Sequence, residues 1–286
     1  MSAAYNELLD ATIQHLEGLK ARGVRHIAIA PETLRALAQP APKSFQASVS
    51  SVQSSQVPEL KTENLKRETA LIPDTRPSTP DKSAAFAALR ERALACVKCP
   101  NLASSRKNVV FGVGSIDAQL MFVGEAPGAD EDEQGEPFVG KAGQLLTKII
   151  QATGLSRADV YIANILKCRP DTPGQSAGNR KPTPEEMQTC IPYLHEQIDL
   201  IRPQVIIALG ATAVEGLLGK TVGITKLRGH WQTYRGTPLM PTYHPAYLLR
   251  NQSLSEKRRV WEDMLAVMEK LGMPVSEKQR NYFLKA

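Results

Sequence analysis

From residue 83 onward, short apolar runs alternate with stretches in which apolar positions recur at helical spacing. The apolar runs cover residues 118–124, 160–164, 203–210 and 238–243. The amphipathic stretches cover residues 141–154, 182–203, 211–219 and 255–272. Strands that alternate with helices are typical of a parallel sheet covered on both faces. The pattern therefore predicts an α/β fold with three α/β/α layers and a central four-stranded parallel sheet.

The first 82 residues follow a different pattern. Residues 1–38 have apolar positions at helical spacing and predict a helical N-terminal appendage. Residues 39–82 are rich in Ser, Gln and Pro without a usable apolar period, which is typical of a linker. We place the main domain at 83–273 and a C-terminal tail at 274–286. We expect the appendage to dock an unidentified protein partner.

Composition and charge narrow the class of protein. The chain has 286 residues, 42% of them hydrophobic, which is enough for one domain of about 200 residues and an appendage. No apolar run approaches the roughly 18–20 residues of a membrane span, and the N-terminus MSAAYNELLD lacks the features of a signal peptide. We therefore expect a soluble, cytoplasmic protein. A net charge of +6 and a pI near 9.1 permit an anionic partner such as nucleic acid without establishing one.

The chain contains four cysteines, of which two form the tight pair CVKC, Cys96 and Cys99. The other two, Cys168 and Cys190, lie far from this pair along the chain. In an intracellular chain such a set favours a metal or cluster site over two disulfides. Four thiolates from three separate segments suit the wide spacing of an iron–sulfur cubane. A zinc site and unligated core thiols stay open as alternatives.

A glycine-rich, acidic loop follows the first apolar run. Residues 123–146 read VGEAPGADEDEQGEPFVGKAGQLL, and the glycines let the backbone approach a ligand closely. An acidic loop without GKS or GKT is a poor phosphate cradle, which argues against a nucleoside-triphosphate P-loop. Taken alone, this loop indicates no more than a solvated acidic turn.

The loop occurs together with other motifs in a fixed order: GEAPG, GEPFVGKAGQLL, NILKCRP, PTPEE and YHPAYLLR. With this combination the chain resembles the iron–sulfur-containing family 4 of the uracil-DNA glycosylase superfamily over about residues 86–271. The resemblance implies hydrolysis of the N-glycosidic bond of uracil in DNA, with release of uracil and an abasic site. It also implies that the four cysteines ligate a structural [4Fe–4S] cluster.

The same resemblance assigns roles to three side chains that follow different strands. Phe138 matches the ring on which a flipped uracil stacks, and Asn164 matches the amide that reads the uracil edge carrying O4 and N3–H. His244 matches the histidine that bonds uracil O2, and its charge state is left open by the sequence. We expect these three side chains to surround one cavity.

Two carboxylates of the acidic loop are candidate catalytic groups alongside the histidine. Glu125 is expected to stabilise the sugar cation or to position water, because Ala126 stands where family 1 enzymes place an aspartate. Glu131 is expected to shape the wall against the methyl group of thymine, together with Asn179. The remaining expected substrate-binding residues in this loop are Ala126, Gly124 and Gly128.

Contacts to DNA are expected from charge and resemblance at Arg250, Lys167 and Arg180. The substrate is then single- or double-stranded DNA containing uracil, and the protein is expected to act as a monomer associated with the nucleoid. The segment between Cys168 and Asn179 is longer than the compact family form. This insertion and Ala126 leave open a DNA-binding module without turnover. A glycosylase for another deaminated base, such as hypoxanthine, is the other alternative.

Overall fold

The structure is a computed structural model, and it describes residues 79–171, 179–219 and 222–284. The chain divides into two units, residues 1–71 and 72–286, and every described residue belongs to the second unit. The predicted appendage lies outside the described residues. Nearly all of the predicted linker lies outside them too, because the first described helix, α3, covers Thr79–Leu94.

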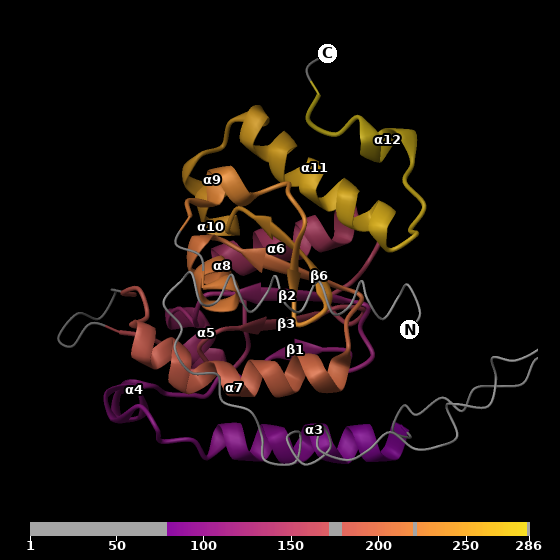
Figure 1. Cartoon of the computed structure of the whole chain (residues 1–286). Coiled ribbons are helices and arrows are strands. Elements are labelled where there is room, and N and C mark those ends of the chain that lie inside the picture. Colours follow the sequence, from indigo (N-terminus) through magenta and orange to yellow (C-terminus); the bar gives the residue numbers. More distant parts are fainter. Residues whose placement is uncertain (1–78, 172–178, 220–221, 285–286) are drawn as a thin grey trace, which may run out of the picture. The chain divides into compact units, whose positions relative to one another are not determined.

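A six-stranded mixed sheet forms the centre of the described unit (Figure 1). The strand order is β1-β3-β2-β4-β6-β5. The strands are β1 (Val113–Gly114), β2 (Leu120–Gly124), β3 (Tyr161–Asn164), β4 (Val205–Leu209), β5 (Gln232–Tyr234) and β6 (Thr237–Thr242). The inner strands β3, β2, β4 and β6 run parallel, whereas β1 pairs antiparallel with β3 and β5 pairs antiparallel with β6.

The α/β class is confirmed, but the sheet is six-stranded and mixed rather than four-stranded and parallel as expected. One missed edge is a hairpin in which Arg235 and Gly236, both with positive φ, connect β5 to β6. Two-residue hairpin turns of this kind usually have the sequence Asn-Gly or Asp-Gly. The sequence Arg-Gly does not predict such a turn. The other missed edge, β1, spans only two residues. No apolar period can be recognised in so short a strand.

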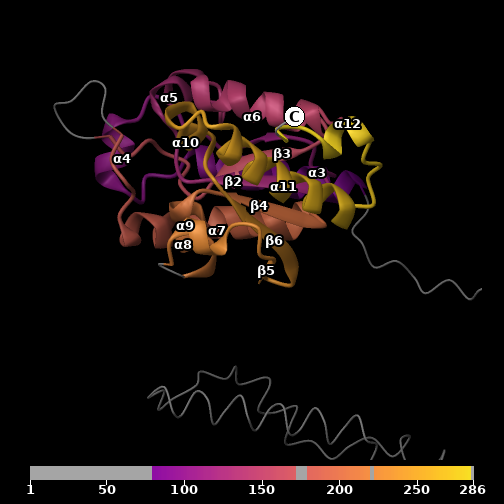
Figure 2. The same ribbon diagram turned by 90° about the horizontal axis from the view of Figure 1, so that it is seen from above.

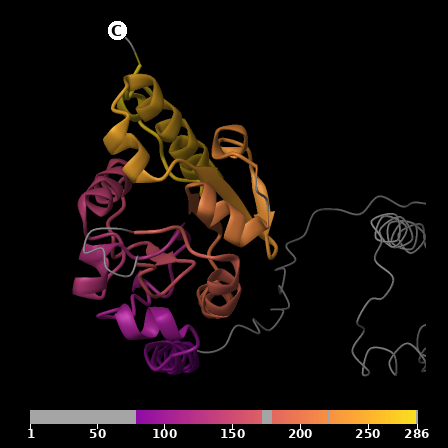
Figure 3. The ribbon, with the colours of Figure 1, turned by 90° about the vertical axis from the view of Figure 1, so that its left-hand side faces the viewer.

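Helices cover both faces of the sheet (Figure 2). Met121 and Val123 belong to one buried cluster, and the alternating residues Leu120 and Phe122 belong to another, as the two-residue period of a strand requires. The long helices over the first face are α7 (Pro184–Ile201) and α8 (Ala211–Leu218), and those over the second are α6 (Lys141–Ala152) and α11 (Leu254–Lys270). Helix α3 lies alongside α7 (Figures 1 and 3).

Short helices occupy several of the connections between these elements. They are α4 (Pro100–Ser105), α5 (Ala129–Gln134), α9 (Ile224–Leu227), α10 (Pro245–Arg250) and α12 (Glu277–Arg280). Helix α5 follows β2 and α10 follows β6, so both lie in loops that leave the carboxyl ends of parallel strands. Within the described ranges, no helix combines the length and the apolar character that crossing a bilayer requires.

The carboxyl ends of the parallel strands meet at one edge of the sheet. Strand β2 ends at Gly124, which is in register with Asn164 at the end of β3, and β6 ends at Thr242. The GEAPG, NILK and YHP motifs follow directly. Ligands of open α/β sheets bind beyond this edge, so the fold gathers the predicted site residues where a ligand is expected.

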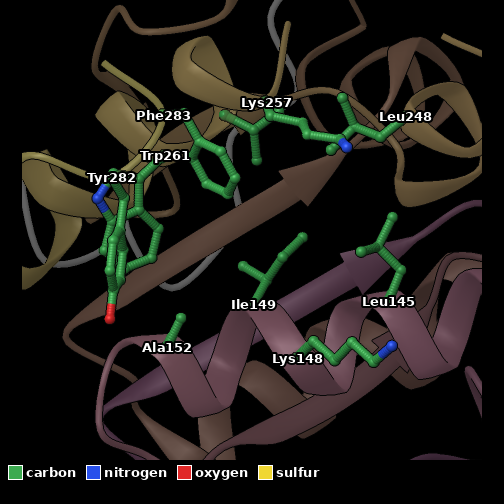
Figure 4. Close-up of a pocket in the computed structure, with 10 residues that line it drawn as sticks. Leu145, Lys148, Ile149, Ala152, Leu248, Lys257, Trp261, Tyr282 and Phe283 are labelled. Atoms are coloured by element: carbon green, nitrogen blue, oxygen red, sulfur yellow. The ribbon is translucent and has the colours of Figure 1, made fainter. Parts of the chain in front are cut away.

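The sequence predicts a C-terminal tail over residues 274–286, and the described part of this segment packs against α11 and α6. The indole N–H of Trp261 donates to the carbonyl of Gln279 at 2.5 Å, and the side-chain amide of Gln279 donates to the carbonyl of Ala152 at 2.9 Å. The rings of Trp261 and Tyr282 lie with their centroids 5.2 Å apart. A groove of about 480 Å³ lies beside this contact, and Figure 4 shows the mainly apolar side chains that line it.

A buried polar network lies at the end of β3. The ammonium of Lys167 donates to the carbonyl of Asn164 at 3.0 Å and to Gln197 Oε1 at 2.6 Å. The amide of Gln197 donates in turn to the carbonyl of Phe111 and to the hydroxyl of Tyr161, both at 2.9 Å. Burial lowers the pKa of Lys167 to about 8. Lys167 is only 2% exposed, so its expected contact with DNA is wrong: its ammonium points into the core.

Replacing Gln197 with Leu should destabilise the protein, because the buried ammonium of Lys167 would lose one of its two acceptors and the carbonyl of Phe111 would lose its donor. We expect the free energy of unfolding in urea to fall by about 3 kcal/mol. Gln188 is exposed on the same helix, and Gln188→Leu should change it by less than about 0.5 kcal/mol. Equal effects of the two substitutions would contradict this prediction.

Candidate active site

A cavity of about 190 Å³ lies beyond the carboxyl ends of β2, β3 and β6. Its lining residues are Ala126, Gly128, Glu131, Phe138, Ala142, Asn164, Asn179, His244 and Ala246. The structure thus brings Phe138, Asn164 and His244 together around one cavity, as expected. Sequence reasoning missed Ala142 and Ala246, because a small apolar side chain carries no chemical signal of its own. Each lies in the first turn of a helix that directly follows a motif. This position beside a motif is the sequence feature that could have indicated a place in the cavity wall.

Gly124 forms the point at which the amide and the aromatic ring meet. A Cβ atom at Gly124 would lie 2.4 Å from Asn164 Oδ1 and 2.5 Å from Phe138 Cζ. Both distances are far below van der Waals contact, so any side chain here would displace one of the two groups. At Gly128, a Cβ would lie 2.7 Å from Glu131 Oε2 and 3.2 Å from Asn179 Nδ2. The two glycines therefore permit the close packing of the cavity wall.

The side-chain carbonyl of Asn164 is a buried acceptor without a hydrogen-bond partner. Asn164 is 2% exposed, and its Oδ1 receives no hydrogen bond in the structure. Its backbone is firmly held, because the backbone carbonyl accepts from Lys167 and the residue is paired in the sheet. An unsatisfied buried acceptor costs about 1–3 kcal/mol. The cavity therefore favours a ligand that brings an N–H or O–H donor to this atom.

Phe138 is held in the left-handed region of backbone conformation, with φ of 56°. Its side chain is buried, and its ring centroid lies 5.5 Å from that of His244 with the planes tilted by 31°. A Cβ on Gly143 would lie only 1.8 Å from the carbonyl oxygen of Phe138. Glycine at the start of α6 therefore makes room for the strained turn that carries the ring.

The carboxylate of Glu131 joins the two loops that form the wall of the cavity. Glu131 Oε2 accepts from the N–H of Gly128 at 3.0 Å, and Oε1 accepts from the N–H groups of Val139 and Gly140 at 2.9 and 3.0 Å. Both carboxylate oxygens are therefore engaged by backbone N–H groups. This geometry ties the GEAPG turn to the PFVG turn.

The imidazole of His244 is neutral at ordinary pH, with its proton on Nε2. Its Nδ1 accepts the N–H of Ala246 at 3.1 Å, so Nδ1 carries no proton. Desolvation lowers the pKa of His244 to about 4, and the positive charge of Arg250 acts in the same direction. A neutral imidazole that accepts at Nδ1 must donate from Nε2. The charge state that the sequence left open is thereby decided.

The other predicted residues differ in whether they line the cavity. Glu125 is half-buried and does not line the cavity. Arg250 is exposed at the end of α10, which begins beside His244. Arg180 donates to both carboxylate oxygens of Glu186 and is thereby engaged within the protein. Asn179 lines the cavity, and its Oδ1 accepts from Arg169 Nε at 2.9 Å. The insertion before Asn179 falls largely on residues 172–178, outside the described ranges.

The four cysteines face a second, much smaller cavity of about 20 Å³. Arg106 donates to Cys168 Sγ at 3.0 Å, and the backbone N–H of Lys167 donates to Cys190 Sγ at 3.3 Å. Burial raises the pKa of Cys190 to about 12 and also raises the pKa of Cys99 and Cys168. Such thiols become thiolates only when a positive group binds them.

All four donors of this site are sulfur atoms, a set that both structural zinc sites and iron–sulfur clusters use. Within the described ranges, no group of three or more His, Cys, Asp or Glu side chains is placed to bind one metal ion. The thiols nevertheless share one cavity from three chain segments. An iron–sulfur cubane places its ligands farther apart than a tetrahedral zinc site does, and donors such as Arg106 bond to cluster sulfurs.

Comparison with known proteins places the chain in a family. A family model described as the uracil DNA glycosylase superfamily matches residues 111–265, more than half of the chain. The chain therefore belongs to the uracil-DNA glycosylase superfamily.

Curated relatives refine this placement. The chain is 49% identical over 178 residues to a type-4 uracil-DNA glycosylase of Thermotoga maritima, over 61% of this chain and 88% of the relative. It is 39% identical over 206 residues to the type-4 protein of Sulfurisphaera tokodaii, over 68% and 89%. A type-5 uracil-DNA glycosylase of Pyrobaculum aerophilum is 31% identical over 190 residues, over 55% and 80%. The expected resemblance to the type-4 branch is confirmed.

The depressed pKa of His244 predicts a specific dependence of stability on pH. Between about pH 6.5 and 4 the unfolded chain binds a proton at this position and the folded chain does not. The stability is therefore fully present above pH 6.5 and declines as the pH falls toward 4, by on the order of 3 kcal/mol from this group. Urea unfolding across pH 4–8 should show a shallower decline in His244→Gln than in the wild type. Parallel curves would contradict the assigned pKa.

Proposed function

We propose that the protein is a uracil-DNA glycosylase that hydrolyses the N-glycosidic bond of uracil in DNA, releasing uracil and leaving an abasic site. The observation that carries this proposal is the unpartnered Oδ1 of Asn164 in the cavity. Uracil has an N3–H donor beside the O4 acceptor, and an amide has an acceptor beside a donor. Cytosine presents the reverse pattern at N3 and C4, so the same amide disfavours it.

A base can reach this cavity only when it leaves the DNA stack. Flipping costs a few kcal/mol, which the pocket must offset. Phe138 lines the cavity, and we assign its ring as the surface on which a flipped base stacks. The small side chains of Ala142 and Ala246 leave the space open. This arrangement accounts for the size and the aromatic wall of the cavity.

Cleavage leaves negative charge on the departing base, and His244 is the group we assign to stabilise it. The neutral imidazole accepts from Ala246 at Nδ1 and so presents an Nε2–H donor. In many enzymes, fixed donors directed at developing charge contribute more to the rate than any other group. A neutral donor needs no carboxylate beside it and keeps its function across the physiological pH range.

Water activation is the step for which we assign Glu125. Glu131 is occupied by three backbone N–H groups, and Ala126 offers no proton acceptor. Glu125 lies between Gly124, where the ring and the amide converge, and Ala126, which lines the cavity. Its carboxylate would stabilise positive charge on the sugar or orient water.

The cysteine site holds a [4Fe–4S] cluster in this proposal. Cys96, Cys99, Cys168 and Cys190 would ligate it, because they line one cavity and form an all-thiolate donor set. The cluster would supply a covalent link between the CVKC segment, the end of β3 and α7. Arg106, which donates to Cys168 Sγ and to the carbonyl of Cys96, would hold the ligand segments in place.

DNA contacts in this proposal centre on Arg250. It is exposed at the end of α10, beside the cavity, whereas Arg180 must leave its ion pair with Glu186 to reach a phosphate. Binding through phosphates weakens steeply with salt. We propose that the protein acts as a monomer in the compartment that contains the DNA.

Replacing Asn164 with Ala should lower the rate of uracil excision by about 100-fold or more while leaving the affinity for DNA nearly unchanged, because the amide reads the base and not the backbone. Excision is measured on oligonucleotides with U:G, U:A, single-stranded U or hypoxanthine, followed by alkaline cleavage. Asn101, exposed on α4, provides the control Asn101→Ala.

Each outcome of that assay decides between functions. Strand breaks at uracil with the wild type support the proposed function. A retarded complex without breaks indicates a binding module, and breaks only at hypoxanthine indicate a different base. An equal loss of excision and of DNA affinity in Asn164→Ala would contradict its assigned role.

Replacing Cys168 with Ala should remove at least about half of the bound iron and lower the thermal stability, because one ligand and its hydrogen bond from Arg106 are lost. Iron content per chain and visible absorbance are the measurements. Thr189 lines the same cavity without offering a thiolate, so Thr189→Ala should keep its iron. Full iron retention in Cys168→Ala would show that the ligand set is wrong.

A further inference from the structure

The turn that carries Phe138 is strained and must be held in place. A bulky residue with φ of 56° is a genuine outlier. Such strain persists only where neighbouring groups over-determine the conformation. Neither the ring nor its stacking face explains how the backbone beneath it is kept in this shape.

Two charged side chains bind the backbone of this turn. One accepts from N–H groups of the turn, and the other donates to carbonyl groups of the turn. Glu131 accepts from the N–H groups of Val139 and Gly140, as described above. Arg157, in the loop between α6 and β3, donates from Nη2 to the carbonyl of Pro137 at 2.8 Å and from Nη1 to that of Phe138 at 3.2 Å. The turn is therefore fixed on both kinds of backbone group, on either side of the strained residue.

Arg157 is suited to this contact by its shape and its surroundings. Its planar fork of donors spans two adjacent carbonyls, which a lysine ammonium cannot match. The residue is half-buried, and burial lowers the pKa of its guanidinium. Nη1 also lies 3.5 Å from Thr147 Oγ1 on α6. The guanidinium is thus partly removed from water, and it binds neutral backbone oxygens instead of a carboxylate. An arginine that served only as a surface charge would not need this arrangement.

We propose that Arg157 is a positioning residue for base excision, because its bonds to the carbonyls of Pro137 and Phe138 hold the Phe138 ring where a flipped base stacks. Arg157 does not line the cavity, so it acts through Phe138. The benefit to excision rests on the proposed function. The grip on the turn rests on the backbone geometry alone.

The test is a double-mutant cycle on single-turnover excision of uracil. Arg157→Met should lower the rate about 5- to 100-fold, the range that corresponds to losing a strained, pre-organised conformation. In a Phe138→Ala background the same substitution should change the rate by less than about 2-fold, because no ring remains to be positioned. Arg157→Lys should restore part of the rate. Equal losses in both backgrounds would overturn the proposal.

Arg258 provides a matched control, because it also donates to two backbone carbonyls, those of Arg280 and Tyr282. Arg258→Met should lower the melting temperature without lowering the excision rate. An equal loss of excision in Arg258→Met would show that loosening the fold suffices and would overturn the proposal.

A spectroscopic measurement separates this proposal from the proposed function. With 4-fluorophenylalanine at position 138, the wild type should give one sharp fluorine resonance, and Arg157→Met should shift or broaden it. If the wild type excises no uracil, the proposed function fails, and this spectrum alone decides whether Arg157 holds the turn. An unchanged spectrum in Arg157→Met would overturn the positioning role.

Discussion

The carboxylate of Glu131 accepts three backbone N–H groups, one from the GEAPG turn and two from the PFVG turn. These bonds tie the turn that precedes α5 to the turn that follows it, through a residue of α5 itself. The ring of Phe138 stands on the second loop and meets the amide of Asn164 over Gly124. Without this tie the strained turn loses its partner on the N–H side, and the cavity loses a wall.

The polar groups of the site are satisfied selectively. The backbone of Asn164 is fixed by the sheet and by Lys167, and Nδ1 of His244 is occupied by the N–H of Ala246. By contrast, Oδ1 of Asn164 is left without a partner inside the cavity. Groups that set orientation are bonded within the protein, and a group suited to recognition is left free for a ligand. This separation is what pre-organisation means at the level of individual atoms.

The cysteine site and the cavity share one short segment of chain. Asn164 ends β3, and Lys167 follows three residues later with its N–H on Cys190 Sγ and its ammonium on the carbonyl of Asn164. Cys168 comes next and is bonded by Arg106. A group bound by the thiols would therefore anchor the segment that presents the amide. Such an anchor would support the site through this connectivity.

The sequence by itself determined the α/β class and the positions of the parallel strands, because apolar periodicity is a local signal. The gathering of Phe138, Asn164 and His244 was expected from the family resemblance of the motifs that carry them. Only the tertiary structure decided the antiparallel edges, the burial of Lys167, the neutral state of His244 and the tie made by Glu131. The sequence around Lys167, which precedes Cys168, does not distinguish a side chain that faces DNA from one that faces the core. Its desolvation and its partners come from segments far apart in the chain, and only their packing determines them.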